Sequence, residues 1–135
     1  MPKDDVPQAP VPIGQAPAPI GRTLATFGDG LGFNVRVLET DGAVVVAVAG
    51  EIDMATADMF HQAIDHACGH NGRVVIDLAS TSFIDSSGLA VLIRARERLG
   101  HGSDALVVRA PGASVRRTFE ISGVDRLVTI VTDLH

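Results

Sequence analysis

From Phe33 onward, the positions of apolar and polar residues follow patterns typical of secondary structure. Alternation predicts a half-exposed strand over Phe33–Leu38, and the wholly apolar run Ala43–Ala49 predicts a strand that is buried on both faces. Asp41 and Gly42 lie between these two segments and form a hairpin turn signal. The folded part of the chain is therefore expected to begin with two antiparallel strands.

Helical and strand-like patterns then alternate to the end of the chain. The predicted helices are Met54–Cys68, Ser87–Leu99 and Ser114–Ser122, and the further predicted strands are Val74–Leu78, Ala105–Arg109 and Leu127–Val131. Such alternation is typical of a largely parallel sheet with right-handed crossovers. We expect an α/β fold with a mixed, mostly parallel sheet of about five strands and three main α-helices.

Helical spacing also predicts which side chains face the core. These are Ala57, Phe60, Ile64 and Ala67 on the first helix, Leu89, Leu92, Ile93 and Leu99 on the second, and Val115, Phe119 and Ile121 on the third. Asp53 precedes the first helix and is expected to cap it, and glycines are expected to end the helices. These glycines are Gly69 and Gly72, then Gly100, then Gly123.

The first 32 residues have a different composition. Six of the seven prolines lie within residues 1–19, interleaved with Ala, Val, Gly and Gln. Such a segment buries too little apolar surface to offset the entropy lost on ordering, so residues 1–32 are expected to form a flexible tail before a domain over 33–135. The glycine-rich run Gly28–Gly32 resembles a nucleotide-binding loop, but a strand pattern follows it, which favours a linker.

Length, charge and cysteine content narrow the class of protein. The 135 residues allow one domain plus a tail, and a formal charge of -5 argues against a general nucleic-acid binder. Cys68 is the only cysteine, so it has no intramolecular disulfide partner and fits a reducing compartment. The sequence has neither a membrane-length apolar run nor a signal-peptide pattern. We therefore expect a soluble, cytoplasmic protein.

The residues Asp85, Ser86, Ser87 and Gly88 stand where the second helix is expected to begin. Backbone N–H groups are unsatisfied there and the helix dipole is positive, so a hydroxyl at this position can accept a phosphate. Asp85 can orient the Ser86 hydroxyl or cap the helix. A plain helix cap is the alternative interpretation of the whole group, and spacing alone leaves the two equally open.

Three segments together resemble the STAS-domain anti-sigma factor antagonists. They are Gly50–Asp53 with Thr56 and Ala57, then Leu78–Leu92, then Val115–Val124. They occur in the order and at the spacing of that family, so the resemblance covers about residues 33–134. Ala90 stands where many members have glycine, which leaves the phosphate acceptor unaffected.

The resemblance implies a STAS fold and a regulatory binding protein rather than an enzyme. In this family, the serine directly after the aspartate is phosphorylated by a partner that is both anti-sigma factor and serine kinase. Ser86 is then the expected acceptor, with Ser87 as the alternative. The unphosphorylated form would bind the kinase and release its sigma factor, phosphorylation of Ser86 would abolish binding, and a phosphatase would reset the switch. The kinase would supply ATP and Mg²⁺, so no cofactor is expected in this chain.

The resemblance also implies where a partner binds and that the protein is a monomer. The net charge and the lack of a membrane-length apolar run argue against contact with nucleic acid or membrane. The expected partner-binding residues are Asp53, Asp85, Ser86, Ser87, Gly88 and Leu89. A simple helix cap remains an equally open interpretation of Asp53. The alternative function is a non-switching STAS scaffold module of a signalling or transport complex.

The sequence gives little support for a metal site or for a hydrolase active site. His61, His66, Cys68 and His70 crowd the end of the first helix, but a spacing of two does not place the last three on one helix face, so no metal is expected. Ser86 lacks the glycine two residues upstream that a hydrolase elbow needs. The arginines of the second helix are expected to be solvated.

Overall fold

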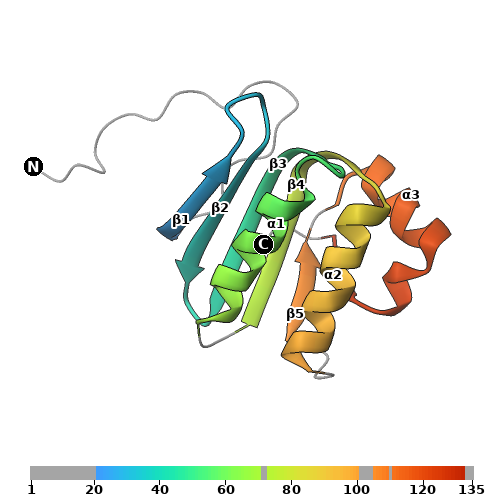
Figure 1. Ribbon diagram of the computed structural model, residues 1–135. Coiled ribbons are helices and arrows are strands. Elements are labelled where there is room, and N and C mark those ends of the chain that lie inside the picture. Colours follow the sequence, from blue (N-terminus) through green and yellow to red (C-terminus); the bar gives the residue numbers. More distant parts are fainter. Residues whose placement is uncertain (1–20, 71–72, 101–104, 110, 133–135) are drawn as a thin grey trace, which may run out of the picture.

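The computed structural model describes residues 21–70, 73–100, 105–109 and 111–132. These residues form one six-stranded sheet in the order β1-β2-β3-β4-β5-β6, with three α-helices and a short 3₁₀ helix (Figure 1). The strands are β1 Arg22–Gly28, β2 Asn34–Thr40, β3 Ala43–Ile52, β4 Arg73–Ile84, β5 Leu106–Arg109 and β6 Thr129–Val131. The helices are α1 Ala57–Cys68, α2 Ser86–Leu99, α3 Ala113–Ser122 and the 3₁₀ helix η2 Val124–Arg126. The predicted α/β class and the three main helices are confirmed.

β1 corrects the predicted boundary between tail and domain. It pairs antiparallel with β2 from Arg22 to Gly28, and Leu24 and Phe27 pack against the core. The glycine-rich run is the loop of this hairpin, so it joins two strands and opens no helix. The folded part therefore includes residues predicted to belong to the tail, and the sheet has six strands rather than about five. Residues 1–20 lie outside the described ranges.

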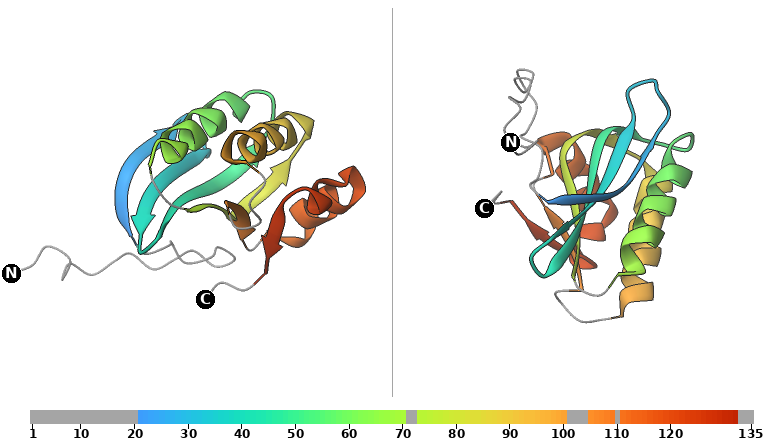
Figure 2. Two further views of the ribbon diagram at one scale, coloured as in Figure 1. Left: turned by 90° about the horizontal axis from the view of Figure 1, so that it is seen from below. Right: turned by 90° about the vertical axis from the view of Figure 1, so that its left-hand side faces the viewer.

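The sheet changes from antiparallel to parallel at β3. β1, β2 and β3 pair antiparallel, and β3, β4, β5 and β6 pair parallel. The three crossovers advance in one direction across the sheet, so right-handed connections place all three helices on the same face. Figure 2 (left) shows α1 and α2 on one side of the curved sheet. Side chains of all three helices join alternate strand residues in one core cluster, among them Val44, Val46, Val74 and Ile76.

Several predicted boundaries shift by a few residues. α1 begins at Ala57 rather than Met54, because residues 54–56 form a turn. β6 begins at Thr129 rather than Leu127, because η2 precedes it. Gly100 and Gly123 end α2 and α3 as predicted, with φ of 87° and 82°. Gly69 ends α1, and Gly72 lies outside the described residues.

The predicted inward faces of the helices are largely confirmed, with one error on α3. Val115 and Phe119 are 0% exposed, but Ile121 is 75% exposed. Ile121 lies two positions beyond Phe119, about 200° further round the helix, so it cannot share the buried face. On the other helices the predicted side chains are buried or pack partly against the core: Ala57, Phe60, Ile64, Ala67, Leu89, Leu92, Ile93 and Leu99.

This difference along α3 can be measured. Phe119→Ala removes a fully buried ring, so we expect it to lower the free energy of unfolding by about 3–5 kcal/mol. Ile121→Ala is the matched control, because its exposed side chain should change that free energy by less than about 0.5 kcal/mol. Urea unfolding followed by circular dichroism provides the comparison, and equal losses from the two variants would contradict the packing of α3.

Candidate functional site

The start of α2 is fixed by Asp85. Its backbone is extended, with φ of -110°, and its Oδ1 accepts hydrogen bonds from the N–H groups of Ser87 at 2.8 Å and Gly88 at 3.4 Å. The N–H of Leu89 donates to the carbonyl oxygen of Asp85 at 3.0 Å, which is the first turn of the helix. Of the two roles expected for Asp85, capping is the one that the geometry supports.

Ser86 is the exposed hydroxyl of this group. It occupies the first helical position, and within the described residues its hydroxyl makes no hydrogen bond. Ser87 is only half-exposed. The side chain of Asp85 already engages two of the helix's first N–H groups. A phosphate on Ser86 would therefore meet the positive end of the helix dipole but also a neighbouring carboxylate.

Gly88 allows α2 to begin directly on the ends of two strands. A Cβ atom at Gly88 would lie 2.6 Å from Cγ2 of Ile52 in β3 and 2.6 Å from Cγ1 of Ile84 in β4. Gly88 is buried and Leu89 is 8% exposed. Gly88 and Leu89 were both predicted to bind a partner. Because both are buried, they support the site from beneath, and neither presents an accessible side chain to a partner.

Asp53 and Thr56 organise the turn between β3 and α1. Oδ1 of Asp53 accepts from the N–H groups of Ala55 at 2.9 Å and Thr56 at 3.1 Å. The hydroxyl of Thr56 accepts from the N–H of Asp53 at 2.9 Å and donates to the carbonyl oxygen of Glu51 at 2.7 Å. Asp53 thus caps the turn that precedes α1, and the prediction that it caps the helix itself is wrong because the helix begins later.

The two turns lie side by side at the carboxyl ends of β3 and β4. Ile52 and Ile84 are register partners, and the N–H of Asp85 donates to the carbonyl oxygen of Ile52 at 3.1 Å. The β1–β2 loop reaches the same end, because a Cβ atom at Gly50 in β3 would lie 2.8 Å from the carbonyl oxygen of Gly32. Figure 1 shows this loop and the starts of α1 and α2 at the upper edge of the sheet.

Three exposed apolar side chains lie on the segments that meet at this edge, in the β1–β2 loop, in the turn before α1 and near the end of β4. Leu31 is 89% exposed, Met54 is 82% exposed and Phe83 is 43% exposed. We call Leu31, Asp53, Met54, Phe83, Asp85 and Ser86 the carboxyl-end surface. Large apolar side chains gathered on a surface often mark an interaction site. The sequence pattern does not single out Leu31 or Met54, because the first falls in the predicted tail and the second in the predicted helix.

Other candidate chemistry finds little support in the described residues. Within these ranges, no three His, Cys, Asp or Glu side chains gather closely enough to hold a metal ion. His66 and His70 stack loosely, with ring centroids 5.3 Å apart. Burial raises the pKa of the half-buried Cys68 thiol, which opposes formation of the thiolate that binds metals. Among the described helices, none has the length and apolar character needed to cross a membrane.

The cap at Asp85 leads to a stability prediction. Asp85→Ala should lower the free energy of unfolding by about 1 kcal/mol, because it removes two hydrogen bonds to the first turn of α2. Asp85→Ser should retain most of that stability, since serine is also a good cap. Ser86→Ala is the control and should be nearly neutral. Chemical denaturation of the three variants tests this, and a neutral Asp85→Ala would contradict the capping role.

The close approach at Gly88 leads to a second stability prediction. Alanine favours a helix by about 1 kcal/mol over glycine, so Gly88→Ala would stabilise an open helix. Here the methyl group would overlap Ile52 and Ile84, and such overpacking costs about 1–3 kcal/mol. We expect a net loss of thermal stability in Gly88→Ala. A raised melting temperature would show that α2 does not rest closely on the strands.

Comparison with known proteins places these features in a family. The family described as "Mlab, STAS domain" matches residues 35–131. The chain is 33% identical over 102 residues to the anti-sigma-F factor antagonist RsfB of Mycobacterium tuberculosis, covering 75% of this chain and 83% of that protein. It is 32% identical over 101 residues to the anti-sigma-B factor antagonist of Listeria monocytogenes, covering 74% of this chain and 88% of that protein.

A solved structure shares both fold and sequence. The crystal structure of an anti-sigma factor antagonist from Mycobacterium paratuberculosis superimposes with a TM-score of 0.69 at 35% sequence identity. The match covers 76% of this chain and 87% of the other. The likeness therefore extends over most of both chains.

Proposed function

Because the chain belongs to the STAS domain family, we propose that it is an anti-sigma factor antagonist whose binding to its anti-sigma factor is switched off by phosphorylation of Ser86. Its relatives are named as antagonists of anti-sigma factors, which supports the general function. The observation that carries the proposal is the exposed hydroxyl of Ser86 at the first position of α2, which makes no hydrogen bond within the described residues.

The surface has the character of a binding site for a protein partner. Leu31, Met54 and Phe83 offer apolar contact area, and Asp53 and the α2 cap give the surrounding turns defined shapes. An interface core of apolar side chains with a polar rim is the usual composition of a protein–protein contact. In this proposal the kinase domain of the anti-sigma factor packs on these side chains and thereby comes within reach of the serine.

Accessibility favours Ser86 over Ser87 as the phosphate acceptor. Ser86 is exposed, whereas Ser87 is half-buried and its N–H is held by Asp85. In the proposed reaction, the hydroxyl oxygen of Ser86 attacks the γ-phosphorus of ATP, ADP leaves and the hydroxyl proton passes to the kinase. The kinase supplies Mg²⁺ and the base. A phosphatase would return the serine by hydrolysing the phosphate ester, with water replacing the serine oxygen on phosphorus and inorganic phosphate released.

The added phosphate would act on the interface rather than on the fold. It contributes roughly -1.5 to -2 charges beside Asp85, and a charge desolvated by a partner is costly unless it is paired. The site lies outside the apolar core, because Ser86 is exposed and its side chain makes no hydrogen bond within the described residues. We therefore expect loss of binding without loss of the folded state.

The test uses the purified chain and an anti-sigma factor kinase from the same organism. Incubation with ATP and Mg²⁺ should add one phosphate to the wild type and to Ser87→Ala, and none to Ser86→Ala. By calorimetry, Ser86→Ala should bind the kinase, whereas the phosphorylated protein should bind at least about tenfold more weakly, a difference of about 1.4 kcal/mol. The phosphorylated protein should melt within a few degrees of the unmodified one, near the shift that 1 kcal/mol produces.

Three results would contradict the proposal. Phosphate on Ser87 alone would move the switch to the other serine. If the phosphorylated protein bound the kinase as tightly as the unmodified one, the domain would bind its partner but phosphorylation would not control that binding. Binding to the kinase with no phosphate transfer at all would favour the non-switching scaffold.

A further inference from the structure

The helices α1 and α2 lie side by side on the sheet (Figure 1) and leave a hollow between them. The floor of this hollow is apolar and consists of Ile64 from α1 and of Val91 and Ala95 from α2. All three side chains are buried and belong to the core cluster. The hollow has a volume of about 90 Å³, and we call it the interhelix hollow.

Four polar side chains surround the floor of the interhelix hollow. They are His61 and Asp65 of α1 and Arg94 and Arg98 of α2. The two residues on each helix are four positions apart, so they point to the same side of that helix. Nη1 of Arg98 forms an ion pair with Oδ1 of Asp65, and Nε2 of His61 lies 3.8 Å from Oδ2 of Asp65. The charge of Asp65 is therefore matched by Arg98 across the hollow.

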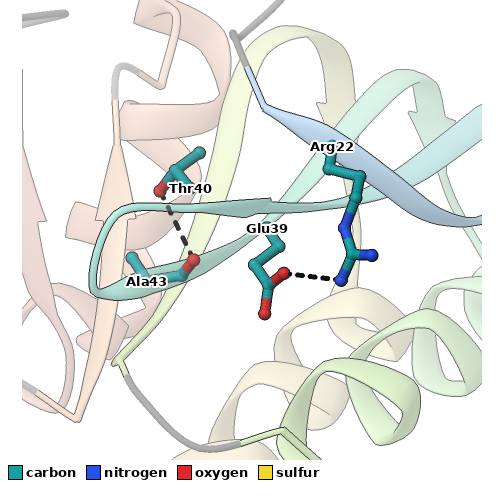
Figure 3. A network of polar contacts seen from close by, with 4 residues as sticks. All are labelled: Arg22, Glu39, Thr40 and Ala43. Carbon is teal, nitrogen blue, oxygen red and sulfur yellow. Dashed lines mark hydrogen bonds and ion pairs between the residues drawn. The ribbon is translucent and has the colours of Figure 1, made fainter.

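Arg94 is the cation that this arrangement leaves unmatched. It is exposed, and within the described residues its guanidinium group makes no hydrogen bond or ion pair. Arg22 is also exposed, but its Nη2 lies 2.7 Å from Oε1 of Glu39, near the hydrogen bond from the Thr40 hydroxyl to the carbonyl oxygen of Ala43 (Figure 3). The interhelix hollow thus combines an apolar floor with a positive charge at its rim.

The size of the hollow limits its occupant to one side chain of a larger molecule. Pockets that hold small-molecule ligands usually measure about 300–1,000 Å³, and an apolar cavity of about 150 Å³ can hold benzene. The interhelix hollow is smaller than both, at about 90 Å³, which favours an aliphatic side chain over a ring. Water is held poorly on an apolar floor, so an apolar group that displaces it gains affinity.

We propose that an aliphatic side chain of the anti-sigma factor fills the interhelix hollow while a neighbouring carboxylate of the same protein pairs with Arg94. This inference rests on the proposed function and adds a second contact with the same partner. Arginine binds carboxylates through two parallel N–H···O hydrogen bonds. Asp53 and Asp85 on the carboxyl-end surface would repel that carboxylate, so its pairing with Arg94 also fixes the orientation of the partner.

A partner that covers Ser86 can also reach the hollow. Val91 and Arg94 follow Ser86 on α2 by five and eight residues, so they lie about 7.5 Å and about 12 Å further along the helix axis. A standard interface covers about 800 Å² of each protein, which is a patch roughly 28 Å across. One partner can therefore make both contacts. The contacts are nevertheless far enough apart for their effects on binding to add.

The test reverses the charge of Arg94 in the full chain and measures binding of the anti-sigma factor kinase from the same organism by calorimetry. Arg94→Glu should weaken binding of the unphosphorylated protein at least about tenfold, because attraction of the carboxylate becomes repulsion. Arg126→Glu is the matched control, since Arg126 is exposed on η2 and the change in net charge is the same. It should alter the affinity less than about twofold, because a distant exposed charge is screened.

Two further measurements separate the hollow from the switch. Ala95→Leu extends a side chain of the floor into the hollow and should weaken binding comparably. If that variant fails to fold, Arg94→Glu still decides, because its side chain is exposed. Phosphorylation of Ser86 should weaken binding of the wild type and of Arg94→Glu by the same factor, because the two sites act independently.

Four results would overturn the inference. Equal affinity of Arg94→Glu and the wild type would do so and would leave the Ser86 switch intact. An equal loss in Arg126→Glu would show that net charge, rather than the hollow, controls binding. A wild type that does not bind the kinase would overturn both this inference and the proposed function. Self-association seen by sedimentation and abolished by Arg94→Glu would assign the hollow to a second copy of this chain.

Discussion

The parallel pairing of β3 and β4 is the constraint on which the rest of the molecule depends. These are the two longest strands, with 10 and 12 residues, and their register runs from Ala43 opposite Arg73 to Ile52 opposite Ile84. Because their carboxyl ends coincide, the turns that follow them start next to each other. A slip of one residue would turn every side chain of a strand to the other face, so burial on both faces of β3 and β4 fixes the register strongly.

Ser86 owes its position to this pairing. The N–H of Asp85 is bonded to the carbonyl oxygen of Ile52, so the start of α2 is held to the end of the neighbouring strand. Gly88 then lets the helix lie against Ile52 and Ile84. An exposed serine is thus carried on a rigid base, although its own hydroxyl makes no hydrogen bond within the described residues. A rigid base suits a residue that a partner must find in a fixed orientation.

The sequence predicts the helices and central strands well because their signals are local. Valine-rich runs, helical spacing and terminal glycines place β3 and α2 within three residues, whereas β4 continues six residues beyond its predicted end at Leu78. β1 is missed because an edge strand has a single neighbour. The short run Arg22–Gly28 is recognisable as a strand only from its pairing with β2. Ile121 is misassigned because it lies near the end of a short helix, where a predicted face of three residues leaves the angle poorly defined.

The site could be predicted in part for the same reason. Asp85 and Ser86 carry a cap signal and a family resemblance that are both contained in a few consecutive residues. Leu31 and Met54 join them only through tertiary structure, because the β1–β2 loop and the β3–α1 turn converge in space and not in sequence. Burial of Gly88 and Leu89 is likewise a property of how α2 rests on two strands, which no single segment encodes.

The engagement of Asp85 with two N–H groups has a thermodynamic consequence for a modified Ser86. Those donors are already used in the free protein, so a phosphate would gain little extra stabilisation from its own helix. Phosphorylation would then change the folding stability of the unbound protein little. Almost all of the coupling free energy between phosphorylation and partner binding would arise in the complex. By reciprocity, a partner that rejects the modified form would itself oppose the modification of any molecule it holds tightly. The isolated domain would then be about equally stable with and without the phosphate, and the two forms would differ only in the presence of the partner.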